Sequence, residues 1–295
     1  MSSPCERPEP FATPEEFLAD FPELRKHACP ALRLHPHLGE PTRESSSAGG
    51  PLLWPTEEPW PTCSLPHYVA TPCYGENGLM FDTQEDVVFD EPVALQPVLQ
   101  LFARDLPQGY SLPHGAEVLQ VLWCPNEHSD PHEAFGHHYG PSVALRWRSS
   151  PEVTDPLAQQ PQPHTKEKEY DVPACELAPE PIMDYPDLDR VPEELAERVM
   201  RWKGQEFDCE EEPERHTYFA LMMARRGMKL GGCEGWEIED PFPMTCSCGT
   251  TLEHLVQIDS MEGPALRNLI IGRAYALNIY YCPASLEHPY RINIQ

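Results

Sequence analysis

The 295-residue sequence has few basic residues, no long apolar run and no recognisable secretion signal. Residues 1–10 contain neither a basic start nor an apolar core, so the sequence predicts no signal peptide. No apolar run approaches the roughly 18 residues that a membrane-spanning helix needs, and we expect none. Together with 11 scattered cysteines, these absences predict a cytoplasmic protein whose cysteines are mostly reduced thiols.

Positive charge is scarce. The 21 basic residues face 48 acidic ones, which gives a formal net charge of −27. Nucleic acids and anionic membrane surfaces repel such a polyanion, so we expect neither as a partner. A basic protein or peptide is the expected partner. The alternative is that the acidity serves only to keep the chain dissolved.

Common catalytic motifs are also missing. The sequence contains no Gly-x-Ser-x-Gly, no phosphate-binding loop, no His-Glu-x-x-His and no dinucleotide-binding fingerprint. Carboxylates are so numerous that no pair stands out as a general acid and base. The sequence therefore favours a non-enzymatic binding protein, with an enzyme of unrecognised site as the alternative.

Proline is abundant, with 36 residues, and its fixed φ and missing donor predict short strands joined by extended loops. Few helices are expected. Thr13, Pro14 and Glu16 form a capping box that predicts a helix start. Apolar residues on one stripe predict a second helix over residues 192–202, and a third is predicted over about 214–226.

Two stretches of the chain share a pattern. In residues 49–63 and 231–246, a Gly-Gly pair precedes a tryptophan by the same spacing, and a Pro-aromatic-Pro triplet follows that tryptophan at the same distance. Predicted strands follow in matching order. Residues 95–105 parallel 252–259, and residues 117–125 parallel 275–283, the latter two ending in Cys-Pro. The matched order predicts an internal duplication.

The predicted fold class is α+β: a β-rich, two-lobed architecture with antiparallel or mixed sheets and a few peripheral helices. A ligand is expected in the cleft between the lobes. The first lobe has an insertion at about residues 64–94. We expect four regions: an N-terminal helical segment (1–30), a first lobe (31–148), a Pro- and acid-rich linker (149–191), and helices with the second lobe (192–295).

Aromatic residues flank the prolines of both repeated stretches. Such clusters are typical of grooves that bind an extended peptide. The alternative is that they pack in the core beneath a proline-rich loop. The candidate binding residues are Trp54, Trp60, Trp236 and Phe242.

The segment Cys246-Ser247-Cys248-Gly249 is the most metal-like part of the sequence. Paired thiolates on a glycine-containing turn suit zinc. However, only one residue separates the thiols, fewer than the two to four of most zinc turns. We expect Cys233 or Cys282 to complete a site, with metal-free buried thiols or a redox role as alternatives.

Other cysteine and histidine groups occur in the first stretch and after it. They favour the metal hypothesis less strongly, because histidines in such loops are mostly solvated. The thiol pair itself is expected only in the second stretch. These weaker candidates are Cys63, His67 and Cys73, then Cys124 with His128, and the loop histidines His132, His137 and His138.

Four segments, in order, resemble the YwqG-like family of uncharacterised bacterial proteins: residues 229–236 (KLGGCEGW), 243–249 (PMTCSCG), 255–259 (LVQID) and 279–282 (IYYC). Residues 49–55 and 119–125 resemble its actinobacterial branch. The family tends to show a Cys-x-x-Cys turn, whereas this chain has Cys-x-Cys, which weakens the expectation of zinc here.

The YwqG-like family is distantly similar to the C-terminal part of eukaryotic programmed-cell-death-two-type proteins, which assist ribosomal proteins. Some bacterial relatives occur in toxin–immunity settings. The resemblance therefore implies a client chaperone or an immunity protein. Both roles bind proteins, and neither supplies catalytic residues.

Overall fold

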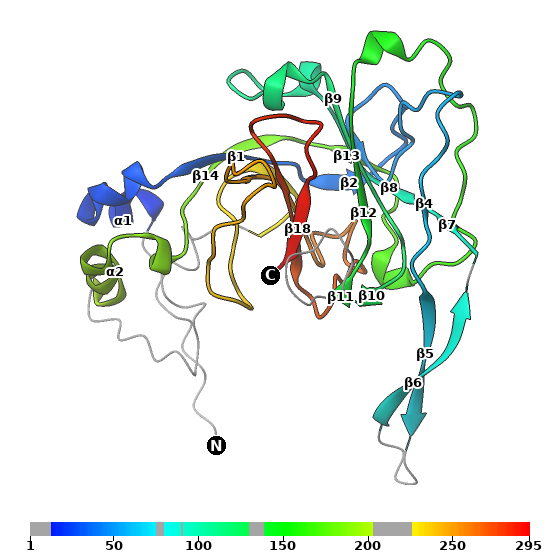
Figure 1. Ribbon diagram of the computed structural model, residues 1–295. Coiled ribbons are helices and arrows are strands. Elements are labelled where there is room, and N and C mark those ends of the chain that lie inside the picture. Colours follow the sequence, from blue (N-terminus) through cyan, green and yellow to red (C-terminus); the bar gives the residue numbers. More distant parts are fainter. Residues whose placement is uncertain (1–12, 75–79, 90, 130–138, 203–225) are drawn as a thin grey trace, which may run out of the picture.

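Two six-stranded antiparallel sheets dominate the structure, a computed structural model shown in Figure 1. It describes residues 13–74, 80–89, 91–129, 139–202 and 226–295, and within 68–89 it describes the strands but not the side chains. The β-rich class and the antiparallel sheets agree with the expectation from sequence. Among the described residues there are two α-helices, α1 (Pro14–Asp20) and α2 (Glu193–Met200).

The first sheet has the strand order β12-β9-β8-β3-β13-β2. Its strands are β12 (Val143–Arg148), β9 (Val118–Trp123), β8 (Gln96–Phe102), β3 (Ser47–Ala48), β13 (Cys175–Leu177) and β2 (Pro36–Leu38).

The second sheet has the order β18-β17-β16-β15-β1-β14. Its strands are β18 (Arg291–Ile294), β17 (Ala276–Tyr281), β16 (Glu253–Asp259), β15 (Lys229–Gly231), β1 (Cys29–Arg33) and β14 (Glu180–Asp184). In both sheets, the first four strands in these orders run from later to earlier positions in the chain.

Three two-stranded sheets and six short 3-10 helices complete the described structure. The small sheets pair β4 (Thr62–Cys63) with β7 (Val93–Ala94), β5 (His67–Tyr74) with β6 (Met80–Phe89), and β10 (His128–Ser129) with β11 (Tyr139–Gly140). The 3-10 helices are η1 (Pro22–Lys26), η2 (Ala103–Asp105), η3 (Pro113–Gly115), η4 (Ser150–Glu152), η5 (Lys168–Tyr170) and η6 (Leu188–Arg190).

A two-stranded ribbon joins the two large sheets. β1 pairs with β14 from Cys29↔Asp184 to Arg33↔Glu180, and β2 pairs with β13 from Pro36↔Leu177 to Leu38↔Cys175. Both pairings keep one register, so the chain passes from sheet to sheet on two adjacent strands, as the arch in Figure 1 shows. The predicted linker 149–191 is thus wrong in its last part, because β13 and β14 are integral strands of the sheets.

One hydrophobic core lies between the sheets. It contains alternate residues of β9, such as Leu119 and Val121, together with their counterparts Leu277 and Ile279 on β17. The alternation follows from the two-residue period of a strand. Because buried side chains of both sheets fill this space, the described residues form one shared core and not the open cleft between lobes that the sequence predicts.

The predicted N-terminal helix is confirmed. The side chain of Thr13 accepts a hydrogen bond from the backbone N–H of Glu16, and the Glu16 carboxylate accepts one from the N–H of Thr13. α1 packs with α2 in a separate apolar cluster, where Phe17 contacts Trp202 with ring centroids 4.8 Å apart. The helix predicted over about 214–226 lies almost entirely outside the described residues.

Each Gly-Gly pair makes the same backbone turn. Gly49 and Gly50 have φ of 71° and 81°, and Gly231 and Gly232 have φ of 69° and 82°. Left-handed φ favours glycine. A Cβ on Gly49 would also lie 2.2 Å from the carbonyl oxygen of Pro173, so no other residue fits there.

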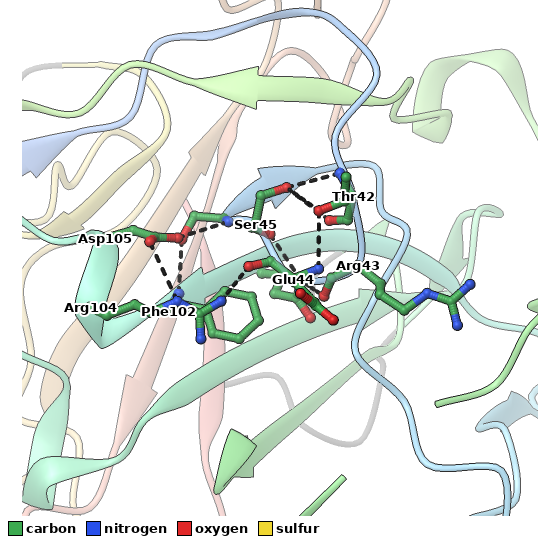
Figure 2. A network of polar contacts seen from close by, with 9 residues as sticks. Thr42, Arg43, Glu44, Ser45, Phe102, Arg104 and Asp105 are labelled. Carbon is green, nitrogen blue, oxygen red and sulfur yellow. Dashed lines mark hydrogen bonds and ion pairs between the residues drawn. The ribbon is translucent and has the colours of Figure 1, made fainter. Parts of the chain in front are cut away.

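Polar contacts fasten the loop before β3 to the end of β8 (Figure 2). The Ser45 hydroxyl donates to the carbonyl of Thr42 at 2.8 Å, which closes a tight turn. Asp105 accepts from the backbone N–H and the hydroxyl of Ser46 at 3.1 and 2.7 Å. The guanidinium of Arg104 donates a hydrogen bond to the backbone carbonyl of Glu44 in this turn. The turn thereby holds the short strand β3 in register.

Candidate metal centres

Four buried cysteine and histidine side chains meet beside the first sheet; we call this group site 1. β4 supplies Cys63, the start of β5 supplies His67, the end of β9 leads into Cys124, and β10 supplies His128. Nε2 of His67 lies 3.2 Å from Sγ of Cys124, and Sγ of Cys63 lies 3.5 Å from Nε2 of His128. The four ligand atoms all lie within 4.8 Å of one another.

The surroundings of site 1 orient its ligands. Nδ1 of His128 lies 3.1 Å from the carbonyl oxygen of Pro66, which can only accept a hydrogen bond. This contact places the ring proton on Nδ1 and turns the lone pair of Nε2 toward the sulfur atoms. The side-chain amide of Asn126 points at Sγ of Cys124, at 3.5 Å. Both contacts are typical of the outer shell of a metal site.

The two thiols of site 1 share one negative charge in the absence of metal. The hydrogen bond from Cys124 lowers the pKa of Cys63 to about 4, and His128 adds to this effect. The same contact, with burial, raises the pKa of Cys124. The site therefore holds a thiolate in a buried position, which is the form that binds a metal.

Three cysteines and a histidine meet beside the second sheet; we call this group site 2. Cys248 lies 3.6 Å from Cys282 between sulfur atoms, and Nδ1 of His288 lies 3.3 Å from Sγ of Cys282 and 3.8 Å from Sγ of Cys246. All four ligand atoms lie within 4.8 Å of one another. Cys282 directly follows β17, as Cys124 directly follows β9.

A tight turn presents the first two thiols of site 2. The N–H of Cys246 donates to the carbonyl of Thr250 at 2.8 Å, and the N–H of Gly249 donates back to the carbonyl of Cys246 at 2.9 Å. Gly249 has φ of 88°, which the turn requires. The hydrogen bond with the Thr250 side chain is the main cause that lowers the pKa of Cys248 to about 6.

Both sites fit a tetrahedral zinc ion. Zinc bonds sulfur at about 2.3 Å and imidazole nitrogen at about 2.0–2.1 Å, so its tetrahedral ligand atoms lie roughly 3.4–3.8 Å apart. The contacts described above run from 3.2 to 3.8 Å. A sulfur–nitrogen donor set also suits zinc better than the hard cations calcium and magnesium.

Of the four predicted metal ligands, the structure brings three together and places the fourth in a disulfide. Cys246, Cys248 and Cys282 come together as expected, and His288 completes the site instead of Cys233. Cys233 forms a disulfide with Cys29, with Cα atoms 5.7 Å apart, so its assignment as a ligand is wrong. The expectation that the thiols are reduced also fails for this pair.

The ligands beside the first sheet form a more complete site than their sequence pattern indicates. Cys63, His67, Cys124 and His128 make up a four-ligand set, so paired thiols are not confined to the second stretch. His288 was not predicted from the sequence as a ligand of site 2. Its position six residues after Cys282 is comparable to that of His128, four residues after Cys124. The side chain of Cys73 and the residues His132, His137 and His138 lie outside the described residues.

The candidate aromatic residues pack beside the two sites. Trp54 is fully buried, its ring centroid lies 4.9 Å from that of Trp60, and Arg148 covers it at 4.1 Å. Trp236 and Phe242 are half-buried, with centroids 5.2 Å apart. Trp54 and Trp60 thus belong to the apolar cluster of Cys63 and Cys124, and Trp236 and Phe242 to that of Cys246 and Cys282.

Comparisons with known proteins add no relative to this description. No protein-family model matches the chain, and no curated protein matches it. Within the described residues, no helix is both long and apolar enough to cross a membrane.

Proposed function

We propose that this protein is a non-enzymatic binding scaffold stabilised by two structural zinc ions, one at site 1 and one at site 2. The observation that carries the proposal is the gathering of eight cysteine and histidine ligand atoms into two sets of four. Four protein ligands leave no open position on a tetrahedral zinc ion. Such closed sites hold structure and do not activate water.

The charge of each proposed centre matches its burial. At site 1, two thiolates and two neutral imidazoles would balance the double charge of zinc, and all four ligands are buried. At site 2, three thiolates and one imidazole would leave a net charge of −1, and Cys248 is exposed to water. Burying an uncompensated charge is costly, so the neutral set belongs in the interior.

We further propose that the two sheets descend from one duplicated unit. Three features support this: the matching strand order, the same left-handed Gly-Gly turn, and an aromatic pair beside each Cys/His cluster. Membership of the YwqG-like family is part of the same proposal, and rests on the sequence motifs alone. It implies a client-chaperone or immunity role.

The client that we propose is a basic protein or peptide. The support is the net charge of −27 and the absence of a catalytic motif from the sequence. A pull-down from native cell extract at low salt tests this part. Recovery of a basic protein that is lost at high salt is expected, and recovery of no protein above background would contradict it.

Metal analysis tests the zinc proposal directly. The purified chain should contain about two equivalents of zinc, since four-ligand sites bind almost stoichiometrically. Cys124→Ser and Cys282→Ser should each reduce the content to about one equivalent. Cys175→Ser is the matched control, because Cys175 is fully buried but lies in neither cluster, and it should keep both ions. Less than about a tenth of an equivalent in the unmodified protein would refute the proposal.

A further inference from the structure

A pocket of about 470 Å³ lies between α2 and the loop of residues 236–241. α2 turns Leu195 and Val199 inward to the apolar cluster that it shares with α1. The adjoining face of the helix lines the pocket with Ala196 and Met200 at helical spacing, and these two residues also pack against the edge of that cluster. Trp236 lies across from them. The pocket therefore combines an apolar lining with one indole ring.

Carboxylates crowd the rim of this pocket. Among its lining residues Arg201 is the one cation, and it pairs with Glu197 at 3.5 Å. In the described part of the chain, the other carboxylates of the rim have no ion pair. The six acidic residues are Asp187, Asp189, Glu193, Glu197, Glu239 and Asp240. Their excess over Arg201 makes the pocket strongly negative.

Asp187 is the carboxylate that points to a ligand. It is 8% exposed, and its Oδ2 accepts a hydrogen bond from the backbone N–H of Trp236 at 3.0 Å. A carboxylate has room for about four such bonds, and among the described residues the side chain of Asp187 accepts this one alone. A buried acceptor with spare capacity at the pocket wall favours a ligand that donates hydrogen bonds.

We propose that this pocket binds an arginine side chain of a basic peptide. The guanidinium carries five donors for carboxylates and a flat face that stacks on an indole ring. Phe242 supports Trp236 from within its apolar cluster, which leaves the tryptophan ring positioned for stacking. This inference rests on the proposed binding of basic clients and names the side chain that they present.

The test uses a fluorescein-labelled peptide, acetyl-Gly-Arg-Gly-Arg-Gly amide, titrated with the full zinc-replete chain in fluorescence anisotropy. The double variant Glu239→Gln/Asp240→Asn should raise Kd about tenfold. The matched control Glu57→Gln/Glu152→Gln removes two exposed carboxylates outside the pocket and should change Kd less than twofold. Trp236→Leu should weaken binding about as much as the pocket pair.

A peptide with both arginines replaced by citrulline tests whether the positive charge is needed. A peptide with both replaced by lysine tests whether the planar guanidinium group is needed. Both should bind at least about fivefold more weakly than the arginine peptide. Equal binding of the lysine peptide would overturn the arginine assignment, and equal effects of the pocket and control pairs would overturn the pocket. If the sample holds two zinc ions but does not bind the arginine peptide, the inference fails while the zinc scaffold stands. If the unmodified protein takes up less than about a tenth of an equivalent of zinc and still binds the peptide, the arginine pocket stands while the zinc scaffold fails.

Discussion

Water reaches the sulfur atoms of the two proposed zinc centres to different extents. All four ligands of site 1 are buried, whereas Cys248 of site 2 is exposed. A chelator must reach the metal ion, and a ligand that is exposed to water opens a path to it. We therefore expect a chelating colorimetric indicator, added in excess, to take up the zinc of site 2 first and that of site 1 only as the fold opens.

A colorimetric zinc indicator measures this order as a fast and a slow phase of equal amplitude. Cys282→Ser should remove the fast phase and Cys124→Ser the slow phase. Release of both ions in one phase from the unmodified protein would contradict the difference in exposure.

The buried carboxyl group of Asp259 should make the stability of the fold depend on pH. Its side chain is 3% exposed and accepts hydrogen bonds from the N–H groups of Gly227 and Ser260. Burial is the main effect and raises the pKa of Asp259 to about 6 in spite of those bonds. In the unfolded chain the pKa is about 3.9. The contribution of this carboxyl group to stability is therefore complete below about pH 4 and is lost as the pH rises through about 6.

The variant Asp259→Asn removes this titration. Between pH 5 and pH 8 the free energy of unfolding of the variant, relative to the unmodified protein, should rise by about 1 kcal/mol. Urea unfolding at the two pH values measures it. Asp155→Asn, at an exposed carboxylate, should show no such change. A pH-independent difference for Asp259→Asn would contradict the raised pKa.

At the scale of elements, a disulfide joins β1 to the chain just after β15. It links Cys29 to Cys233 across 204 residues, and a cross-link over so long a loop restricts the unfolded chain strongly. Cys29→Ser/Cys233→Ser should lower the free energy of unfolding by about 2–4 kcal/mol under oxidising conditions. With a phosphine reductant, the unmodified protein and the double variant should unfold alike. A difference that persists in reductant would show that the disulfide is not its cause.

A buried ion pair also joins the strands on either side of β1. Nζ of Lys229 on β15 lies 2.5 Å from the carboxylate of Asp184 on β14, and both side chains are fully buried. The two strands flank β1, so the pair spans the strand between them. Burial lowers the pKa of Lys229, while the charge of Asp184 opposes this shift. The pair fixes how the joining ribbon meets the second sheet.

For the whole molecule, the shared core couples the two sheets. Leu119 of β9 and Leu277 of β17 belong to one cluster, and the Tyr290 hydroxyl donates to the carbonyl of Val143 across the sheets at 2.5 Å. We therefore expect one unfolding transition. Tryptophan fluorescence and far-UV circular dichroism should give coincident curves in urea.

Loss of either zinc ion should lower that single midpoint and not split it. Cys124→Ser and Cys282→Ser, each followed by both probes, supply the measurement. Two separated transitions in either variant would mean that the sheets unfold independently, in conflict with a common core.

Local patterns predicted much of the fold. Thr13 and Glu16 specify the start of α1 through a capping box, and the β-branched and aromatic runs predict β9 and β17. β8 and β16 lie in the matched segments that precede them. The helix predicted over 192–202 appears as α2. β13 and β14 were missed because they are short and lie among prolines. Their strand character comes from pairing with β1 and β2, which are far away in the sequence.

The sequence by itself determined the β-rich class, the positions of several strands and most of the cysteine ligands of the candidate sites. The tertiary structure alone decided which side chains meet: His67 reaches Cys124 over 57 residues, and His288, not Cys233, joins Cys246. Spacing along a strand fixes the face on which a residue lies. Only the register between distant strands decides its partner, because register depends on the pairing of the whole sheet.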